Sequence, residues 1–413
     1  MSGSVKIVGA YAMIEGYNKN NKISEMESVA ISRIIEEKNV LFFVVISIIA
    51  FFIRWTVIGF KSSDMMICLE PWYDEIKNNG GLLSLKNQVG NYNLLYQTLI
   101  AVMTYINVDS ILQYKLLSIV FDYILAVGIA FLAMDSDNGL VIWKERKSLI
   151  AYSIVLILPE VIMNSSLWGQ CDSIYSTFCI FTLLCMWHNK YLRAFIFYGF
   201  AVAFKLQAIF LMPFMIIVYF CKKKYSIFYF VLSLISFWSS GIVAYIYGRS
   251  LLAPFSIYLS QTGDYPFMYL NSLSFWRLIG DDYATLKNIA ILLTVSILGL
   301  CMYSVIDEKI EVKTKEQFIR LACWTIWTCY LFLPGMHERY GYLLDVLLIP
   351  LLFIDKKKYL LIFIIVTLFT AIQYAAFLFS HNVVEDWQII IYILCYVYMG
   401  YLMSKKENEQ IEA

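Results

Sequence analysis

Apolar runs of about 20 residues recur along this chain from residue 40 almost to its C-terminus, with short polar connections between them. A helix of that length and composition matches the hydrocarbon thickness of a bilayer. Hydrophobic residues make up 60% of the chain and charged residues only 15%, whereas soluble domains carry about 25% charged residues. The pattern predicts an all-α polytopic membrane protein and excludes a sizeable soluble domain.

Thirteen apolar segments can be distinguished, and connections rich in lysine and arginine orient them, because such connections stay in the cytoplasm. The segments are 40–60, 92–108, 113–134, 148–163, 172–187, 191–204, 205–221, 225–248, 284–306, 318–335, 340–354, 359–380 and 387–404. The basic clusters are Lys144–Lys147, Lys222–Lys224, Lys309–Lys315, Lys356–Lys358 and Lys405–Lys406. Both termini are then cytoplasmic, which requires an even number of spans. We expect about 12 transmembrane helices (range about 10–13), with 92–108 as one re-entrant or interfacial candidate.

A single membrane-embedded domain over 40–404 is expected between cytoplasmic tails at 1–39 and 405–413. Met26 lies closer to the first apolar segment than Met1, so both remain candidate starts. The composition is rich in Ile, Asn, Lys and Tyr, which is typical of a low-GC genome. The expected location is a bacterial plasma membrane. Charges gather at the rims of the apolar segments, and most segments are free of charge at their centres.

Polar residues concentrate in four connections that the charge pattern places on the extracytoplasmic side. They are 61–92, 168–173, 258–282 and 337–340. Lys205, between two short apolar segments, is expected near the same side. Ionisable groups at a membrane edge commonly mark a substrate or ion path. A site built from these connections would combine carboxylates, cations and aromatic rings.

Two acids in these connections are candidates for chemistry. Asp64 follows the first apolar segment by a few residues, where a carboxylate near the dry membrane edge can accept a proton from a hydroxyl nucleophile. The alternative is a solvated loop acid. Asp172 begins an apolar run after a Trp-Gly-Gln-Cys turn. Its negative charge either stabilises the start of a helix through the helix dipole, or it orients a sugar hydroxyl.

The run His337-Glu338-Arg339-Tyr340 places two cations and an acid between two apolar segments with almost no loop around them. Arginine binds phosphate in a bidentate manner. The alternative is an ion pair between Glu338 and Arg339 at a helix turn. Lys205 either binds phosphate or extends toward the interface. Aromatic rings in the polar connections suit sugar rings but also form interface belts; they include Trp72, Tyr92 and Trp168.

These polar patches resemble, in their order along the chain, the GT-C superfamily of lipid-dependent glycosyltransferases, and most closely the bacterial relatives of the second mannosyltransferase of glycosylphosphatidylinositol synthesis. The resembling elements are SSD at 62–64, PWYDEIKNNGG at 71–81, GNYNLLY at 90–96, LWGQCDSIY at 167–175, AFKLQAIFLMPF at 203–214 and MHERYGYLLDVLLIP at 336–350. LWGQCDSIY and MHERY are the specific elements. Together the elements sample most of the expected membrane domain.

The resemblance implies transfer of a hexose, such as mannose, from a polyprenyl-phosphate carrier to a lipid-linked or surface glycan on the extracytoplasmic face, with inversion. It implies Asp64 as the general base and makes Asp172 a site residue. It also implies phosphate contacts for His337, Arg339 and Lys205. The remaining residues expected to bind substrate are Gln170, Trp168, Glu338, Tyr340, Trp72 and Tyr92.

The chain departs from superfamily members that carry two acids one residue apart in the first loop, because Asp64 is followed by Met65 and Met66. A metal bridge through paired acids is therefore not indicated. No cofactor is required, and a divalent metal (Mg or Mn) is left open. The nine cysteines show no CxxC or Cys/His spacing, which argues against structural zinc.

Two other functions compete with the transferase. A surface-polysaccharide polymerase would also be a multi-span, tyrosine-rich enzyme, but its large outer loops usually come later in the chain. A lipid-linked-sugar flippase or transporter would carry ionisable residues at mid-membrane and repeat symmetry. The expected partners are the lipid-linked donor, the glycan acceptor and the bilayer, with no nucleic acid. The sequence names neither the sugar nor the acceptor.

Overall fold

The computed structural model describes residues 37–134, 141–222, 224–380 and 384–405, and this part of the chain is almost entirely helical. The predicted tails at 1–39 and 405–413 lie almost wholly outside the described residues. Five helices are long and apolar enough to cross a membrane. They are α3 (Lys38–Val57), α6 (Ser110–Ala133), α15 (Tyr283–Ile306), α18 (Lys356–Leu378) and α19 (Asp386–Ser404).

A sixth candidate span is a broken helix. Arg146–Ile157, which is α7, meets Pro159–Trp168, which comprises α8 (Pro159–Ile162) and the π-helix η4 (Met163–Trp168), at 53°. Pro159 explains the bend, because its ring cannot continue the hydrogen-bond ladder of the preceding helix. These lengths are compatible with a membrane protein. The expected 12 spans are not settled by helix length and stay a prediction.

Several apolar segments form helices shorter than a bilayer. They are α5 (Leu94–Met103), α9 (Asp172–Trp187), α10 (Tyr191–Phe204), the run Leu206–Cys221 within η5 (Leu206–Leu211) and α11 (Met212–Lys222), and α12 (Phe228–Ser239). Ten residues rise about 15 Å, which is half the hydrocarbon thickness. The re-entrant or interfacial placement of segment 92–108 stays a prediction, because α5 is one of several helices of this kind.

The outer helices expose apolar side chains that soluble proteins normally bury. Only 11% of the apolar window of α3 and 22% of that of α15 is buried. The exposed side chains of α3 include Phe42, Ile48 and Phe52. Continuous apolar faces of this kind are suited to contact with lipid tails.

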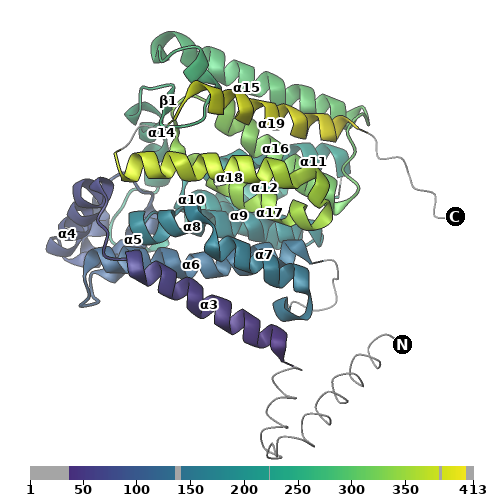
Figure 1. The fold of residues 1–413 in the computed structure, drawn as a ribbon. Coiled ribbons are helices and arrows are strands. Elements are labelled where there is room, and N and C mark those ends of the chain that lie inside the picture. The colour runs from purple at the N-terminus through teal and green to yellow at the C-terminus, as the bar shows by residue number, and fades with distance from the viewer. Residues whose placement is uncertain (1–36, 135–140, 223, 381–383, 406–413) are drawn as a thin grey trace, which may run out of the picture.

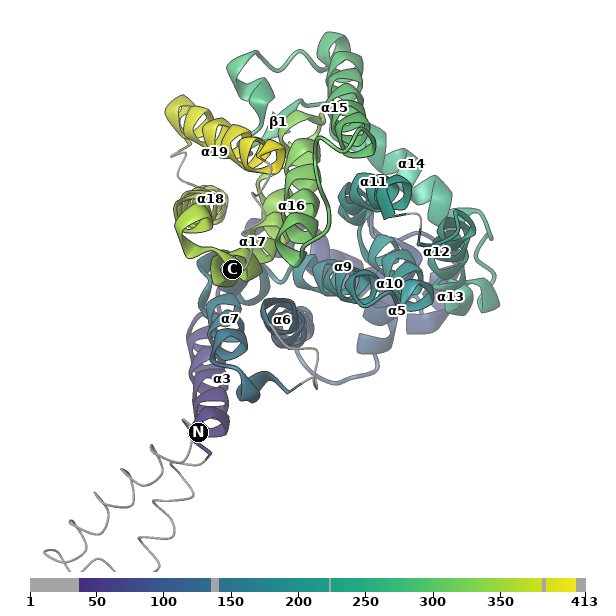
Figure 2. The same ribbon diagram turned by 90° about the vertical axis from the view of Figure 1, so that its right-hand side faces the viewer.

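The bundle has a buried centre and a peripheral ring. Residues 316–332 of α16 (Lys315–Phe332) are all buried, and so is most of α17 (Tyr342–Ile354). Viewed along the bundle, α18 and α19 lie on one side of this pair, α9, α10 and α11 on another, and α3, α6 and α7 beyond α17 (Figure 2). The centre therefore holds the connection between α16 and α17 in place.

The connections that the sequence analysis grouped together lie at one end of the bundle. Figure 1 shows α4 (Glu70–Asn78), α14 (Ala253–Asp264) and β1 (Tyr269–Leu270) at that end. The strand β1 pairs in parallel with β2 (Met336–His337), joining Leu270 to His337. This short ladder ties two of the polar connections, 258–282 and 337–340, to each other.

Buried charges inside the helices are exceptions to the predicted charge-free centres. Asp122, at the middle of α6, forms a 2.9 Å ion pair with Arg54 of α3, and both side chains are fully buried. Ser165 donates to the same carboxylate at 2.6 Å, and Arg54 donates to the carbonyl of Leu156 at 2.8 Å. A buried charge is costly unless it is paired. This network therefore fixes the otherwise loosely packed α3, whose end leads to Asp64.

Candidate functional site

The position of Asp64 is set by the end of α3. Lys115 of α6 donates to the carbonyl of Ile58 at 2.7 Å and also to the carbonyl of Phe60. These are carbonyls that a helix end leaves without backbone partners. Ser62 then accepts a hydrogen bond from the backbone N–H of Met65 at 3.2 Å, and the π-helix η1 (Met65–Leu69) begins. Asp64 is thereby held at the start of η1.

Two side chains from a distant turn bind the carboxylate of Asp64. Trp168 Nε1 donates to Oδ2 at 2.9 Å, and Gln170 Nε2 donates to the same oxygen at 2.6 Å. Gln170 in turn accepts from the hydroxyl of Tyr92 at 3.2 Å through Oε1. Four of the predicted site residues thus form one connected group.

The Trp-Gly-Gln turn needs its glycine. Gly169 ends η4 with φ of +69°, and a Cβ there would lie 2.8 Å from Cε of Met65. The backbone N–H of Gln170 then donates to the carbonyl of Asn164 at 3.0 Å, and this hydrogen bond closes the turn. Because only glycine combines this φ with this close approach, the turn can direct Trp168 and Gln170 to one carboxylate.

Asp172 lies next to this turn, pairs closely with Lys205 and lies farther from Arg339. Its Oδ1 is 2.5 Å from Nζ of Lys205, and its Oδ2 is 4.0 Å from Nε of Arg339. Asn164 donates to Oδ2 at 2.9 Å and also contacts the hydroxyl of Tyr374 at 3.2 Å. Asp172 is fully buried, so it acts on the site through Lys205 and Arg339.

Arg339 is surrounded by aromatic rings and carboxylates but is not closely bonded to them. Its Cζ stands 5.1 Å from the ring centroid of Trp168 and 5.9 Å from that of Tyr340. Its Nη1 lies 3.7 Å from Oε1 of Glu338. The two carboxylate distances, 3.7 and 4.0 Å, exceed normal hydrogen-bond lengths. The guanidinium therefore keeps donors that a phosphate can take up.

His337 and Glu338 have shifted pKa values because they are buried beside cations. Burial, together with Arg339 and Lys205, lowers the pKa of His337 to about 3. Its imidazole is neutral at pH 7, so this run supplies one cation and not the two expected from the sequence. Burial raises the pKa of Glu338 to about 7, against the opposing effect of Arg339. Glu338 therefore changes charge near neutral pH.

A cavity of about 560 Å³ opens in front of these groups. The predicted site residues that line it are Asp64, Trp72, Tyr92, Gln170, Lys205, Arg339 and Tyr340. The ring of Trp72 meets that of Tyr92 edge-on at 5.7 Å. Gly90 makes room for Trp72, since a Cβ at Gly90 would lie 2.4 Å from the indole. One wall thus offers aromatic faces and another a carboxylate and two cations.

Four predicted site residues are not among the residues lining this cavity in the described part of the chain. They are Trp168, Asp172, His337 and Glu338. Each is at least nine-tenths buried, and each contacts a lining residue or an element that carries one. Trp168, Asp172 and Glu338 lie beside Asp64, Lys205 or Arg339, whereas the His337 ring packs against Tyr265 and Tyr340. Direct contact of these four side chains with substrate stays a prediction.

Several lining residues were not predicted to belong to the site. They are Cys68, Asn91, Gln207, Gln261, Tyr265 and Tyr283. Burial and the neighbouring Asp64 raise the pKa of Cys68, so its thiol stays protonated at neutral pH. Gln261 donates to the carbonyl of Asn91, which joins α14 to the first outer connection. Polar residues in outer connections were the available signal for most of them. Tyr374, which contacts Asn164 behind the cavity, lies in the last turns of α18 and gave no such signal.

No group of three or more His, Cys, Asp or Glu side chains that could hold a metal ion occurs within the described residues. The sequence left binding of a divalent metal open, and this observation does not change that interpretation. A site of this kind can deprotonate a hydroxyl at Asp64 and stabilise an anion at Arg339 and Lys205 within a single cavity.

No family model matches the chain, and no curated protein matches it.

Proposed function

We propose that this protein is an integral membrane glycosyltransferase that moves a hexose from a polyprenyl-phosphate carrier to a glycan acceptor. One observation carries the proposal: Asp64, Lys205 and Arg339, which lie far apart in the sequence, line one cavity together with the aromatic side chains of Trp72 and Tyr92. A carboxylate and two cations that line one cavity beside aromatic faces suit displacement of a phosphate by a hydroxyl.

The proposed step is an inverting displacement. The acceptor oxygen forms a bond to the anomeric carbon while Asp64 takes its proton. The bond from the anomeric carbon to the phosphate oxygen breaks, and the electron pair leaves with the phosphate. Arg339 and Lys205 stabilise the charge that grows on the phosphate, because preorganised cations in a water-poor site need no reorganisation during the reaction. Both hydrogen bonds from Trp168 and Gln170 fall on Oδ2, so we assign the proton to Oδ1 of Asp64.

Trp168 supports both halves of this step. Its N–H holds the carboxylate of Asp64, and its ring lies beside the guanidinium of Arg339. The same ring stacks on Phe377 of α18 at 4.4 Å and 16°. The base and the phosphate-binding cation are therefore positioned by one rigid side chain.

The setting of the proposed reaction follows from the sequence. We place the site on the extracytoplasmic side of a bundle of about 12 spans, with both termini in the cytoplasm of a bacterial cell. The GT-C resemblance favours mannose among the hexoses and a lipid-linked or surface glycan as acceptor.

The first test is sugar transfer from radiolabelled polyprenyl-phosphate hexoses in membranes that contain wild-type protein or Asp64→Asn. Loss of a general base should lower transfer at least about 100-fold. The matched control is Asp74→Asn, an exposed acid of α4 that does not line the cavity in the described part of the chain. It should leave transfer unchanged at equal expression.

Two outcomes would contradict the proposal in different ways. Full transfer by Asp64→Asn would move the base to another residue. An absence of transfer from every monosaccharide carrier, in membranes that also contain the cell's acceptors, would favour the polysaccharide polymerase or the lipid-linked-sugar flippase.

A further inference from the structure

A second cavity lies beside the candidate site and differs from it in chemistry. It has a volume of about 600 Å³ and is lined almost entirely by apolar side chains from α10, η5, α11, α12 and α14. We call it the apolar groove; its residues are Tyr198, Gly199, Val202, Leu206, Ile209, Met212, Phe230, Ser233, Leu234, Phe237, Phe255, Tyr258 and Leu259. Its one non-tyrosine hydroxyl, that of Ser233, is bonded to the carbonyl of Phe195 at 2.7 Å.

The groove adjoins the polar cavity next to a phosphate-binding cation. Leu206, Ile209 and Tyr258 line both spaces. Leu206 directly follows Lys205, which lines the polar cavity. From this junction the groove follows α10 back past Val202 to Tyr198, a distance of about 10 Å along the helix.

The groove is also open along its length. Leu234 of α12 is 52% exposed and Leu259 of α14 is 73% exposed, although both line it. Its floor is formed where α10 and α12 approach closely: a Cβ on Gly199 would lie 2.4 Å from the carbonyl oxygen of Ser233. An elongated apolar ligand can therefore enter from the side without displacing a helix.

We propose that the apolar groove holds the isoprenoid chain of the sugar donor while Lys205 and Arg339 hold its phosphate. The proposal rests on the transferase function proposed above and assigns one of the two lipids in that reaction to a place in the fold. The donor is favoured over a lipid-linked acceptor because its chain is attached directly to the phosphate, and the groove begins beside Lys205. An acceptor hydroxyl must instead reach Asp64.

The groove acts mainly by orientation. Bilayer lipid solvates an isoprenoid chain as well as apolar side chains do, so the hydrophobic effect contributes little to this contact. A chain fixed along α10 instead directs the attached phosphate and sugar into the polar cavity. Blocking the groove should therefore raise the KM of a long-chain donor by about tenfold rather than abolish transfer.

The test compares two neighbouring substitutions on α12. Leu234→Trp fills the groove, whereas Ile235→Trp adds the same ring at a position that is 54% exposed and does not line the groove in the described part of the chain. KM is measured with a long-chain polyprenyl-phosphate hexose and with its geranyl-phosphate analogue, whose short chain ends near the junction. We expect Leu234→Trp to raise only the long-chain KM and Ile235→Trp to change neither.

Equal KM values for wild type and Leu234→Trp with the long-chain donor would overturn the proposal. They would indicate that bilayer lipid, and not the donor chain, occupies the groove. An equal rise with both donors would overturn it as well, because the ring would then act on the polar cavity.

A second measurement does not depend on transfer. Radiolabelled polyprenyl phosphate is crosslinked to photoreactive benzoylphenylalanine placed at Leu259 in the groove or at Leu292, which is 68% exposed on α15. Labelling at residue 259 that is displaced by unlabelled polyprenyl phosphate, with none displaced at residue 292, supports the groove. Equal labelling at both positions contradicts it, whether or not the protein transfers sugar.

Discussion

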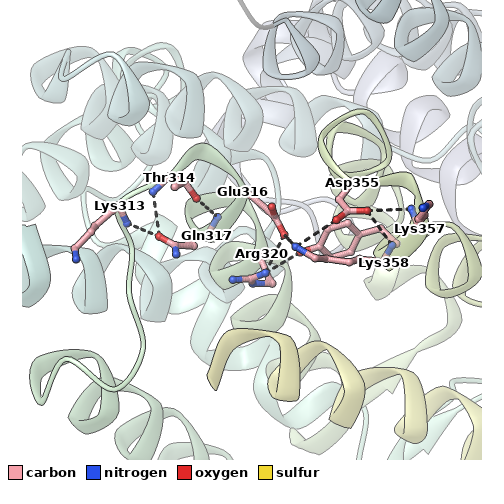
Figure 3. A network of polar contacts seen from close by, with 9 residues as sticks. Lys313, Thr314, Glu316, Gln317, Arg320, Asp355, Lys357 and Lys358 are labelled. Atoms are coloured by element: carbon pink, nitrogen blue, oxygen red, sulfur yellow. Dashed lines mark hydrogen bonds and ion pairs between the residues drawn. The ribbon is translucent and has the colours of Figure 1, made fainter. Parts of the chain in front are cut away.

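Two polar clusters are buried at the ends of α16, and they differ in how their charges are paired. At its N-terminal end, Glu316 accepts from Arg320 at 2.9 Å and from Tyr359 at 2.6 Å, with Lys358 at 3.4 Å (Figure 3). We call this the closed cluster. Past the C-terminal end, about 27 Å away along the helix, Arg339 lies 4.0 and 3.7 Å from its two carboxylates and faces a cavity.

The closed cluster pairs its charges at hydrogen-bond distance, although Nε of Arg320 has no hydrogen-bond partner within the described residues. Asp355 also accepts from the backbone N–H groups of Lys357 and Lys358, so it caps α18 (Figure 3). Buried charges bonded in this way hold α16 and α18 together but leave little for a ligand. The guanidinium of Arg339, by contrast, has no carboxylate within normal hydrogen-bond distance and lines an open cavity. Incomplete pairing next to a cavity, rather than burial of charge by itself, therefore distinguishes the candidate site.

The largest expected effect comes from the same substitution in the two clusters. Arg339→Met should lower transfer about 100-fold, because the leaving phosphate loses its main cation. Arg320→Met should leave transfer per folded molecule unchanged and lower the free energy of unfolding by about 3 kcal/mol, since a buried pair is broken. Transfer assays and thermal unfolding in detergent would measure both. If the two variants lost activity and stability in the same proportion, the distinction between the clusters would be wrong.

A smaller effect is expected at Trp168, which joins the base to the cation. Trp168→Phe keeps a ring beside Arg339 but removes the donor to Asp64, so kcat should fall about tenfold with the donor KM unchanged. Trp168→Leu should raise the donor KM as well. Trp327→Phe is the control, because its buried Nε1 has no hydrogen-bond partner within the described residues. A rise in donor KM for Trp168→Phe would show that the N–H does not act on the base alone.

The smallest effect concerns the pH dependence of donor binding. The pKa of Glu338 is raised to about 7, mainly by burial. Above that pH its carboxylate ionises and competes with the donor phosphate for Arg339, so the donor KM should rise about threefold between pH 6 and 8. Glu338→Gln should flatten this dependence.

Stability should follow the same titration. Because the pKa of Glu338 is higher in the folded state than in the unfolded state, its contribution is present at low pH and is lost as the pH rises through 7. Wild type should therefore lose stability relative to Glu338→Gln from pH 6 to 8. Parallel pH curves for the two proteins, in KM or in unfolding temperature, would remove Glu338 from the titration.

The sequence indicated the fold class and most of the site because both are written in local patterns. Apolar runs predict helices by their length, and the polar residues that follow them predict that Asp64, Lys205 and Arg339 lie near one another; all three line one cavity. The wall of the cavity from α14 was only partly visible, since Gln261 and Tyr265 resemble ordinary loop residues. The buried pair of Arg54 and Asp122 was missed, because neither residue carries a sign of its partner.

The amino-acid sequence by itself determined that this chain forms apolar helices and which polar residues follow their ends, since periodicity and charge act over a few neighbouring residues. Only the tertiary structure decided that Asp172 supports Lys205 and Arg339 from behind, that Trp168 contacts both Asp64 and Arg339, and that His337 is neutral. These outcomes depend on distances of a few ångströms and on exclusion of water. Both arise from the packing of helices that lie far apart in the chain.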